Sequence, residues 1–274
     1  MSQWDRLLLN LGVWEGTFAR RSPSGQLQSS IPSVVTLEGL NQNQTMRQVI
    51  QKLEDGETRE QVLEYSALSR GVYFFETGAF SQGSLQRGPF SVFGAELGFI
   101  HGDRRLRLVQ MFDPQAQLSQ ITLIQEQRQG VAGLSPQPPL TVNALIGTWQ
   151  GEATTHYPDL RSPDHYSTML QLERQGDSLT QSLLLPHQTI TSQARITASA
   201  IRFGDGEAMV QVLLLPGGAS STTPLSLPKH QAFFLEAGWL ISPTLRQRMI
   251  RRYDDSGALE SLTFVIEQKQ TESR

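Results

Sequence analysis

RLRLVQMFDPQAQLSQITLIQEQR runs from Arg105 to Arg128, and RQRMIRRYDDSGALESLTFVIEQK runs from Arg246 to Lys269. The two stretches align without a gap, and most positions are identical or exchange like for like. In both, apolar residues alternate with polar ones, which is typical of β-strands with two distinct faces. A compact turn at 113–116 or 254–257 interrupts each alternation. We therefore predict that the chain contains the same β-hairpin twice.

Shorter elements repeat as well. LGVWEG at 11–16 and IGTWQG at 146–151 both read apolar-Gly-x-Trp-x-Gly, and a short apolar, helix-like segment precedes each. The repeat length of about 140 residues suits a whole duplicated domain better than a solenoid unit. Residues 130–139 have the Gly- and Pro-rich composition of a linker. We predict a first domain at 1–132, a linker at 133–140 and a second domain at 141–274.

Further candidate strands follow at short spacing in both halves, among them 33–40 in the first half and 166–173 in the second. Many short strands separated by turn signals predict a sandwich or a barrel. Closure removes the exposed edges of an open sheet. We therefore expect an all-β fold of two tandem antiparallel β-barrels, each with a short N-terminal helix. The Gly-, Ser- and Pro-rich run at 215–224 is predicted to be a loop.

The composition narrows the classes of function. The chain has 274 residues and a formal net charge of −3, and its lysines and arginines are scattered, which argues against a nucleic-acid binder. It contains no cysteine, which excludes disulfides, thiolate metal sites and cysteine nucleophiles. No apolar stretch is long enough to span a membrane, and the first residues lack the basic start of a secretion signal. We expect a soluble, cytoplasmic protein.

The Gly-x-Trp element resembles the signature of the lipocalins and their calycin relatives. This resemblance implies lipocalin-like barrels in which Trp14 and Trp149 plug the closed ends, with an arginine from a late strand lying across each ring. An arginine over a tryptophan face is also favourable as a cation–π contact. The tandem as a whole resembles an uncharacterised two-domain family frequent in cyanobacteria.

The second half carries closer resemblances. LIGTWQGE at 145–152, which leads into His156 and Tyr157, resembles the opening of nitrobindins, which are small haem-binding barrels. EAGW at 236–239 resembles their later Glu-x-Gly-aromatic element. The same opening is similar to that of the lipocalin-like lyases that attach bilins to phycobiliproteins. These resemblances imply a tetrapyrrole as ligand or cofactor and a phycobiliprotein as partner.

The repeated hairpin carries a pair of arginines in each half. Arg105 and Arg107 lie two residues apart and share one face of their strand, as do Arg246 and Arg248. An inward arginine would bind a ligand carboxylate with two parallel hydrogen bonds. Alternatively, one arginine closes the barrel over the tryptophan and the other forms an exterior ion pair with a glutamate. The sequence leaves both interpretations open.

The register of the hairpin decides which side chains meet these arginines. If the strands pair regularly from the turn, Thr122 faces Arg107, and Glu126 lies diagonally near Arg105, within reach of a long side chain. The second half repeats the arrangement. A shift of one residue would move every side chain to the other face of the sheet.

His156 lies near the opening strand of the second half, where it either ligates haem or contacts a bilin, or is a surface histidine. None of the five histidines forms a His-x-His or His-x3-His pair, so no metal site is predicted. No spacing selects a catalytic triad, so no catalytic residue is predicted. The candidate ligand site comprises Arg107, Trp149, His156, Tyr157, Glu236, Arg246, Arg248 and Glu267.

These observations favour a binding protein that holds an apolar, tetrapyrrole-like or fatty-acid-like molecule inside a barrel. One alternative is a chromophore lyase or isomerase acting on a bilin, with His156, Glu236 or Glu267 as its acid or base. The other is a structural or interaction module whose barrels are filled by side chains. The binding protein is preferred to the enzyme.

Overall fold

The computed structural model describes residues 1–131, 136–198, 200–206 and 209–270. The predicted boundary at 132, residues 133–135 of the predicted linker and the last residues, 271–274, lie outside this part of the chain. The all-β fold is confirmed, with one short helix at the start of each half, α1 (Gln3–Leu8) and α2 (Val142–Leu145). None of the helices in the described ranges is long and apolar enough to cross a membrane.

The first half forms one curled antiparallel sheet of nine strands. The strands are β1 (Gly12–Arg21), β2 (Leu27–Leu40), β3 (Thr45–Glu54), β4 (Glu57–Tyr65), β5 (Tyr73–Phe74), β6 (Phe80–Gly83), β7 (Phe93–His101), β8 (Arg104–Phe112) and β9 (Leu118–Arg128). Their order in the sheet is β4-β3-β2-β1-β9-β8-β7-β6-β5. This sheet stays open, with β4 and β5 as its two edges.

The second half forms a closed antiparallel barrel of ten strands. They are β10 (Gly147–His156), β11 (Asp164–Gln175), β12 (Ser178–Leu185), β13 (Gln188–Ile196), β14 (Ala200–Phe203), β15 (Val210–Leu214), β16 (Ala219–Pro224), β17 (Phe233–Ser242), β18 (Leu245–Tyr253) and β19 (Leu259–Lys269). They follow one another round the barrel in chain order, and β19 pairs with β10 to close it.

One missing strand explains why the first half does not close. In the second half, β14 connects β13 to β15. At the corresponding place, between β4 and β5, residues 66–72 form no strand, and β5 itself has only two residues. The stretch reads SALSRGV, in which glycine and, less strongly, alanine disfavour extended pairing. The first half is therefore a half-barrel, and the second half is a complete barrel.

The run at 215–224 is not the predicted loop. Pro216–Gly218 forms one short 3-10 turn, and the Ser/Thr-rich residues after it form β16, which pairs with β15 and β17. Its prolines lie before the strand and at its last residue, where a missing N–H costs little. Threonine favours strands, and this tendency outweighs the turn signals that predicted a loop.

The predicted hairpin register is also wrong by a small shift. The pairing is irregular beside each turn, between Met111 and Phe112 and between Arg252 and Tyr253. Phe112 already pairs with Leu118, one residue beyond the predicted partner, and the irregularity adds one more residue, so Arg107 pairs with Ile124 rather than Thr122. A β-bulge of this kind adds a residue to one strand, and the sequence of the turn gives no sign of it.

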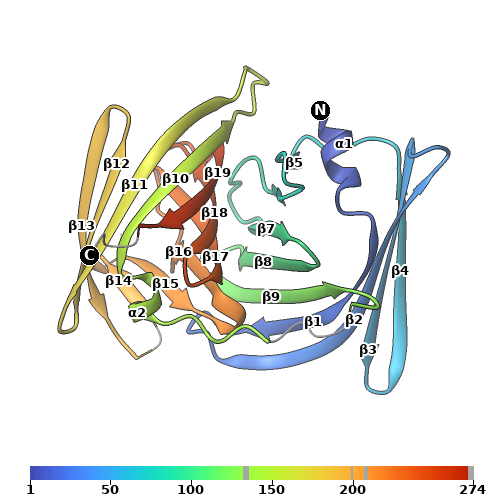
Figure 1. Ribbon diagram of the computed structural model, residues 1–274, viewed down its shortest axis with the longest axis horizontal. Coiled ribbons are helices and arrows are strands. Elements are labelled where there is room, and N and C mark those ends of the chain that lie inside the picture. The colour runs from blue at the N-terminus through green and yellow to red at the C-terminus, as the bar shows by residue number, and fades with distance from the viewer. Residues whose placement is uncertain (132–135, 199, 207–208, 271–274) are drawn as a thin grey trace.

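The two halves pack side by side through the outer faces of their sheets (Figure 1). The largest buried cluster draws on both halves and includes Leu106 and Leu108 of β8 and Leu235 and Ala237 of β17. Smaller clusters lie on the inner faces of each half. Strands β8 and β18 are therefore covered on both faces: Leu106 and Leu108 of β8 and Met249 of β18 face the other half, and Arg105, Arg107, Arg246 and Arg248 face inward.

Contacts between the halves come in matched pairs. The backbone N–H of Leu118 donates to the carbonyl of Leu225, and that of Leu259 donates to the carbonyl of Leu85. Leu118 and Leu259 hold the same position in the repeated hairpin, so the halves exchange roles in these two contacts. The exchange is what a twofold rotation produces. The halves are therefore related by an approximate twofold axis, as the subunits of an isologous dimer are.

Side chains near the axis follow the same rule. Gln110 Nε2 donates to Ser221 Oγ at 2.8 Å, and Arg251 Nη1 donates to Ser81 Oγ at 2.9 Å. Gln110 and Arg251 are equivalent in the repeat. Phe93 and its equivalent Phe233 meet with ring centroids 5.7 Å apart. The interface is thus symmetric in its geometry but not in every residue.

Candidate functional site

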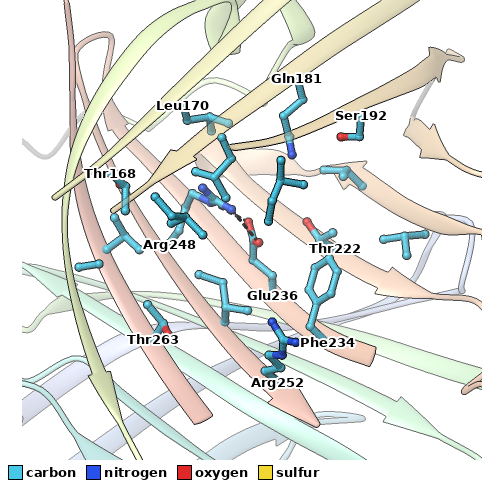
Figure 2. Close-up of a pocket in the computed structure, with 18 of the residues that line it drawn as sticks. Thr168, Leu170, Gln181, Ser192, Thr222, Phe234, Glu236, Arg248, Arg252 and Thr263 are labelled. Carbon is cyan, nitrogen blue, oxygen red and sulfur yellow. Dashed lines mark hydrogen bonds and ion pairs between the residues drawn. The ribbon is translucent and has the colours of Figure 1, made fainter. Parts of the chain in front are cut away.

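The second barrel contains a cavity of about 730 Å³. Its wall is mostly apolar, with leucines, isoleucines and valines from β11 to β15. Figure 2 shows Arg248 and Glu236 joined to each other at the wall of this space, with Phe234 and Arg252 on the same side of it. Hydroxyl groups interrupt the apolar wall and belong to Thr155, Tyr157, Tyr166, Thr168, Ser192, Ser220, Thr222, Ser261 and Thr263. The volume lies within the range of small-molecule sites.

Four charged side chains form an ion-pair quartet at the inner wall of this cavity, Glu236, Arg246, Arg248 and Glu267. Arg248 donates from Nε and Nη2 to the two oxygens of Glu236, at 2.8 and 2.9 Å, and from Nη1 to Glu267 at 3.1 Å. Arg246 donates from Nε to Glu267 at 2.6 Å. Two positive and two negative groups cancel, so the quartet has no net charge.

The first half contains the same quartet, Glu96, Arg105, Arg107 and Glu126. Arg105 bonds both oxygens of Glu126, at 2.6 and 3.0 Å. Arg107 bonds Glu126 at 2.8 Å and Glu96 at 2.8 Å. Each arginine–glutamate pair lies inside its half, which contradicts the interpretation with an exterior ion pair. Arg105 and Glu126 are directly opposite one another rather than diagonal, because the register differs by two residues from the predicted one.

Ion pairing within the quartets keeps Glu126, Arg248 and Glu267 in their charged forms. Burial alone would raise the pKa of Glu267, but the guanidiniums of Arg246 and Arg248 outweigh it and hold that pKa below its ordinary value. Burial would lower the pKa of Arg248, but Glu236 and Glu267 raise it instead. In the first half, Arg107 and Arg105 likewise overcome burial and lower the pKa of Glu126 to about 2. Such groups do not exchange protons near neutral pH.

A tryptophan lies under the outer arginine of each quartet. The guanidinium of Arg246 is 4.9 Å from the ring centre of Trp149, and that of Arg105 is 4.5 Å from Trp14. Each indole N–H donates to a backbone carbonyl of the preceding segment. Both tryptophans are fully buried, each in the apolar cluster inside its own half.

One position marks a difference between the interiors of the two halves. Ala153 of β10 lines the cavity, in the same row across the sheet as Val265 and Arg248. The equivalent residue of β1 is Phe18, four positions after its tryptophan as Ala153 is after Trp149. The ring of Phe18 lies 5.3 Å from the Arg107 guanidinium. Phe18 therefore covers the arginine that Ala153 leaves open to the cavity.

The structure separates the predicted site residues into four groups. Tyr157, Glu236, Arg246 and Arg248 line the cavity. Trp149 and Glu267 are fully buried and contact the cavity-lining Arg246, Trp149 through its ring and Glu267 through a hydrogen bond. Arg107 belongs to the quartet of the first half. His156 lies outside the barrel, between the two halves.

Strand alternation places His156 there. Trp149, Ala153 and Thr155 point into the barrel, so His156 points out of it. It packs against Tyr73 and Phe75, and its Nε2 is 3.4 Å from Arg6 Nη1. Burial, followed by the charge of Arg6, lowers its pKa from 6.5 to about 4. This position does not suit contact with a ligand in the cavity.

Sequence reasoning missed the apolar wall and the hydroxyls of the cavity. Leu170, Leu179 and Thr222 each lie on a strand with alternating character, and only the closed barrel brings them together. The exchange of Phe18 for Ala153 was visible in the repeat and could have indicated which half is hollow. Among the described residues, no cluster of histidine, aspartate and glutamate is placed to hold a metal ion.

The fold and the cavity define a class of protein: a tandem β-barrel protein in which a hollow barrel packs against a half-barrel. The chain belongs to the DUF3598 family. The model of the DUF3598 N-terminal domain, a domain of unknown function, matches residues 1–131. Residues 136–270 match the C-terminal domain of the biogenesis factor required for ATP synthase 1.

A solved structure supports this membership over the whole chain. It is a DUF3598 protein of unknown function from Nostoc punctiforme, with 48% identity and a TM-score of 0.93, covering 98% of this chain and 100% of its own. A phycobiliprotein lyase from Guillardia theta is 9% identical, with a TM-score of 0.38, over 48% of this chain and 91% of its own. That likeness is too low to carry an argument. No curated protein matches the chain.

Proposed function

We propose that the second barrel binds a small, largely apolar molecule, and that this is the function of the protein. The cavity of about 730 Å³ inside the closed barrel is the observation that carries the proposal. Closed barrels of this size hold single small ligands when side chains do not fill them. A tetrapyrrole and a fatty-acid-like molecule both remain candidate ligands, as does a phycobiliprotein as a partner.

The lining favours binding over catalysis. Its described residues include no histidine and no lysine, and His156 lies outside the barrel. Glu267 and Arg248 keep their charges near neutral pH. Of its three candidate residues, the lyase or isomerase alternative keeps only Glu236, and both oxygens of that carboxylate accept hydrogen bonds from Arg248. The module with filled barrels is disfavoured by the cavity itself.

A titration with a neutral, polarity-sensitive fluorophore tests the proposal. N-phenyl-1-naphthylamine should brighten on binding the protein, with saturation at one site. Ala153→Phe, which copies the first half, should weaken this binding about tenfold or more. Gln150→Phe adds the same ring to an exposed position of the same strand and should change nothing. Absence of saturable binding by the native protein would rule the proposal out.

Absorbance titrations with haem and with a linear bilin test the tetrapyrrole. Saturable binding with a shifted spectrum, lost in Ala153→Phe and kept in Gln150→Phe, would identify a tetrapyrrole ligand. If the fluorophore binds but neither pigment does, the ligand is a colourless apolar molecule.

A second candidate is a role in protein assembly. It is favoured by the match of residues 136–270 to a domain of an ATP synthase biogenesis factor. Phe90 and Leu160 also offer large apolar side chains, 88% and 85% exposed, at positions with positive φ. Exposed apolar groups on strained turns often mark contact sites. Purified ATP synthase subunits should bind the native protein and not the Phe90→Ser, Leu160→Ser double variant, and no binding to the native protein would exclude this role.

A further inference from the structure

The charges around the cavity are already balanced. Arg246 and Arg248 are paired within the quartet, and Arg252 at the cavity wall donates to Glu260 at 2.7 Å. Every arginine that lines the cavity thus has a carboxylate of the protein as its partner. A ligand carboxylate placed beside the quartet would add an uncompensated negative charge to a largely buried site.

Two members of the quartet are accessible from the cavity. The side chains of Arg248 and Glu236 are 14% and 12% exposed, whereas that of Glu267 is not exposed. Arg248 uses Nε, Nη1 and Nη2 for one hydrogen bond each, so Nη1 and Nη2 each keep a second N–H. Each oxygen of Glu236 accepts one bond from Arg248 and has a further lone pair. A donor and an acceptor therefore lie side by side at the cavity wall.

We infer that the polar end of the ligand is an uncharged group that carries an acceptor and a donor side by side, such as an amide or a lactam. Its carbonyl would accept from Arg248 and its N–H would donate to Glu236. Both bonds are charge-assisted, and the neutrality of the quartet is preserved. This inference rests on the proposed function and specifies the chemistry of the ligand. It replaces the carboxylate that the sequence suggested as the partner of Arg248.

Displacement of the neutral fluorophore by three ligands of equal chain length tests the inference. Dodecanamide offers a donor and an acceptor, methyl dodecanoate offers acceptors alone, and dodecanoate, held at about pH 8 to keep it ionised, offers a full negative charge. The amide should bind about tenfold or more tightly than the carboxylate, with the ester between them.

Charge variants sharpen the test. Glu236→Gln leaves the quartet with a net positive charge, so the carboxylate should gain about tenfold in affinity relative to the amide. Glu96→Gln makes the same change in the first half and should leave both affinities unaltered. The comparison in the native protein needs no variant and stands even if Glu236→Gln does not fold.

The outcomes separate the two proposals. If the fluorophore binds and the carboxylate displaces it as well as or better than the amide, this inference is overturned and the proposed function stands. If the fluorophore does not bind the native protein at all, the proposed function fails, and the inference fails with it.

Discussion

His156 is a neutral imidazole enclosed between the halves of the protein. Two aromatic rings and a guanidinium surround it, and its pKa is lowered from 6.5 to about 4 by burial and by Arg6. Between pH 6.5 and pH 4, His156 is protonated in the unfolded chain and stays neutral in the folded protein. Stability due to this group is therefore complete above pH 6.5 and is lost as the pH falls toward 4.

This linkage predicts an acid-dependent loss of stability. Between about pH 7 and pH 4.5, the native protein should lose about 1–2 kcal/mol more unfolding free energy than His156→Phe, a value discounted for partial solvent screening. Phenylalanine keeps the aromatic packing and removes the titration. Urea unfolding at several pH values measures the difference, and replacement of the exposed His101 by Gln serves as the control. Parallel pH profiles for the native protein and His156→Phe would contradict the prediction.

Residues differ in how far the sequence determines their place. The outward position of His156 follows from its odd spacing from Trp149, because both lie on one strand whose inner face is otherwise apolar or small. The inward position of Arg248 could not be read in the same way. Its strand is buried on both faces, so the apolar residues that usually mark the inside of a barrel mark the interface here.

At the scale of the elements, the repeated Gly-x-Trp-x-Gly has a physical explanation. Its first glycine, Gly12 or Gly147, has a φ of 125° or 119°, which side chains rarely adopt. Its second glycine brings neighbouring strands close. A Cβ on Gly16 would lie 2.0 Å from the carbonyl oxygen of Gln125, and one on Gly151 would lie 2.5 Å from Thr168 Oγ1.

These contacts predict unequal effects of the same substitution. Gly16→Ala forces a backbone carbonyl of β9 to move and should cost about 2–3 kcal/mol, whereas Gly151→Ala meets side chains that can rotate and should cost about 1 kcal/mol. Urea or thermal unfolding of the two variants measures this order. A larger loss for Gly151→Ala would show that the interior of the second barrel is the more rigid of the two.

The repeated hairpins and the all-β class were predictable because alternation and turn residues are local signals. The closure of each half was not. It depends on β14, a strand of four residues whose counterpart at 66–72 is absent from the first-half sheet. Strand β16 was not predictable either. Its serines and threonines are typical of a loop, and it is a strand because β15 and β17 pair with it on either side.

At the scale of the whole molecule, the main apolar core lies between the halves, where it is related by an approximate twofold axis. Matched backbone hydrogen bonds at Leu118 and Leu259 add to the apolar packing. Obligate homodimers have interfaces of this kind, like a domain core cut in two. The halves should therefore hold together without a covalent connection.

A protease site inserted within 132–135 tests this expectation in the full chain. After cleavage, the two fragments should still elute together at native size at about micromolar concentration. Phe233→Asp places a charge beside Phe93 at the axis and should release the fragments after cleavage. Fragments that separate without this substitution would show that the linker is needed to keep the halves together.

Gln110 in the first half and Arg251 in the second occupy equivalent positions but differ in charge. Such a difference is possible because the two halves belong to one chain. Arg251 is fully buried and donates to three neutral oxygens, those of the Tyr253 and Ser81 hydroxyls and the Ser84 carbonyl. In a dimer of identical chains, any such change would occur at both equivalent places and would bury two lone cations. In a single chain, a substitution changes only one of the two equivalent positions, so the sequences of the two halves can change independently. The same freedom allowed Phe18 to cover Arg107 in one half while Ala153 leaves Arg248 open to the cavity in the other.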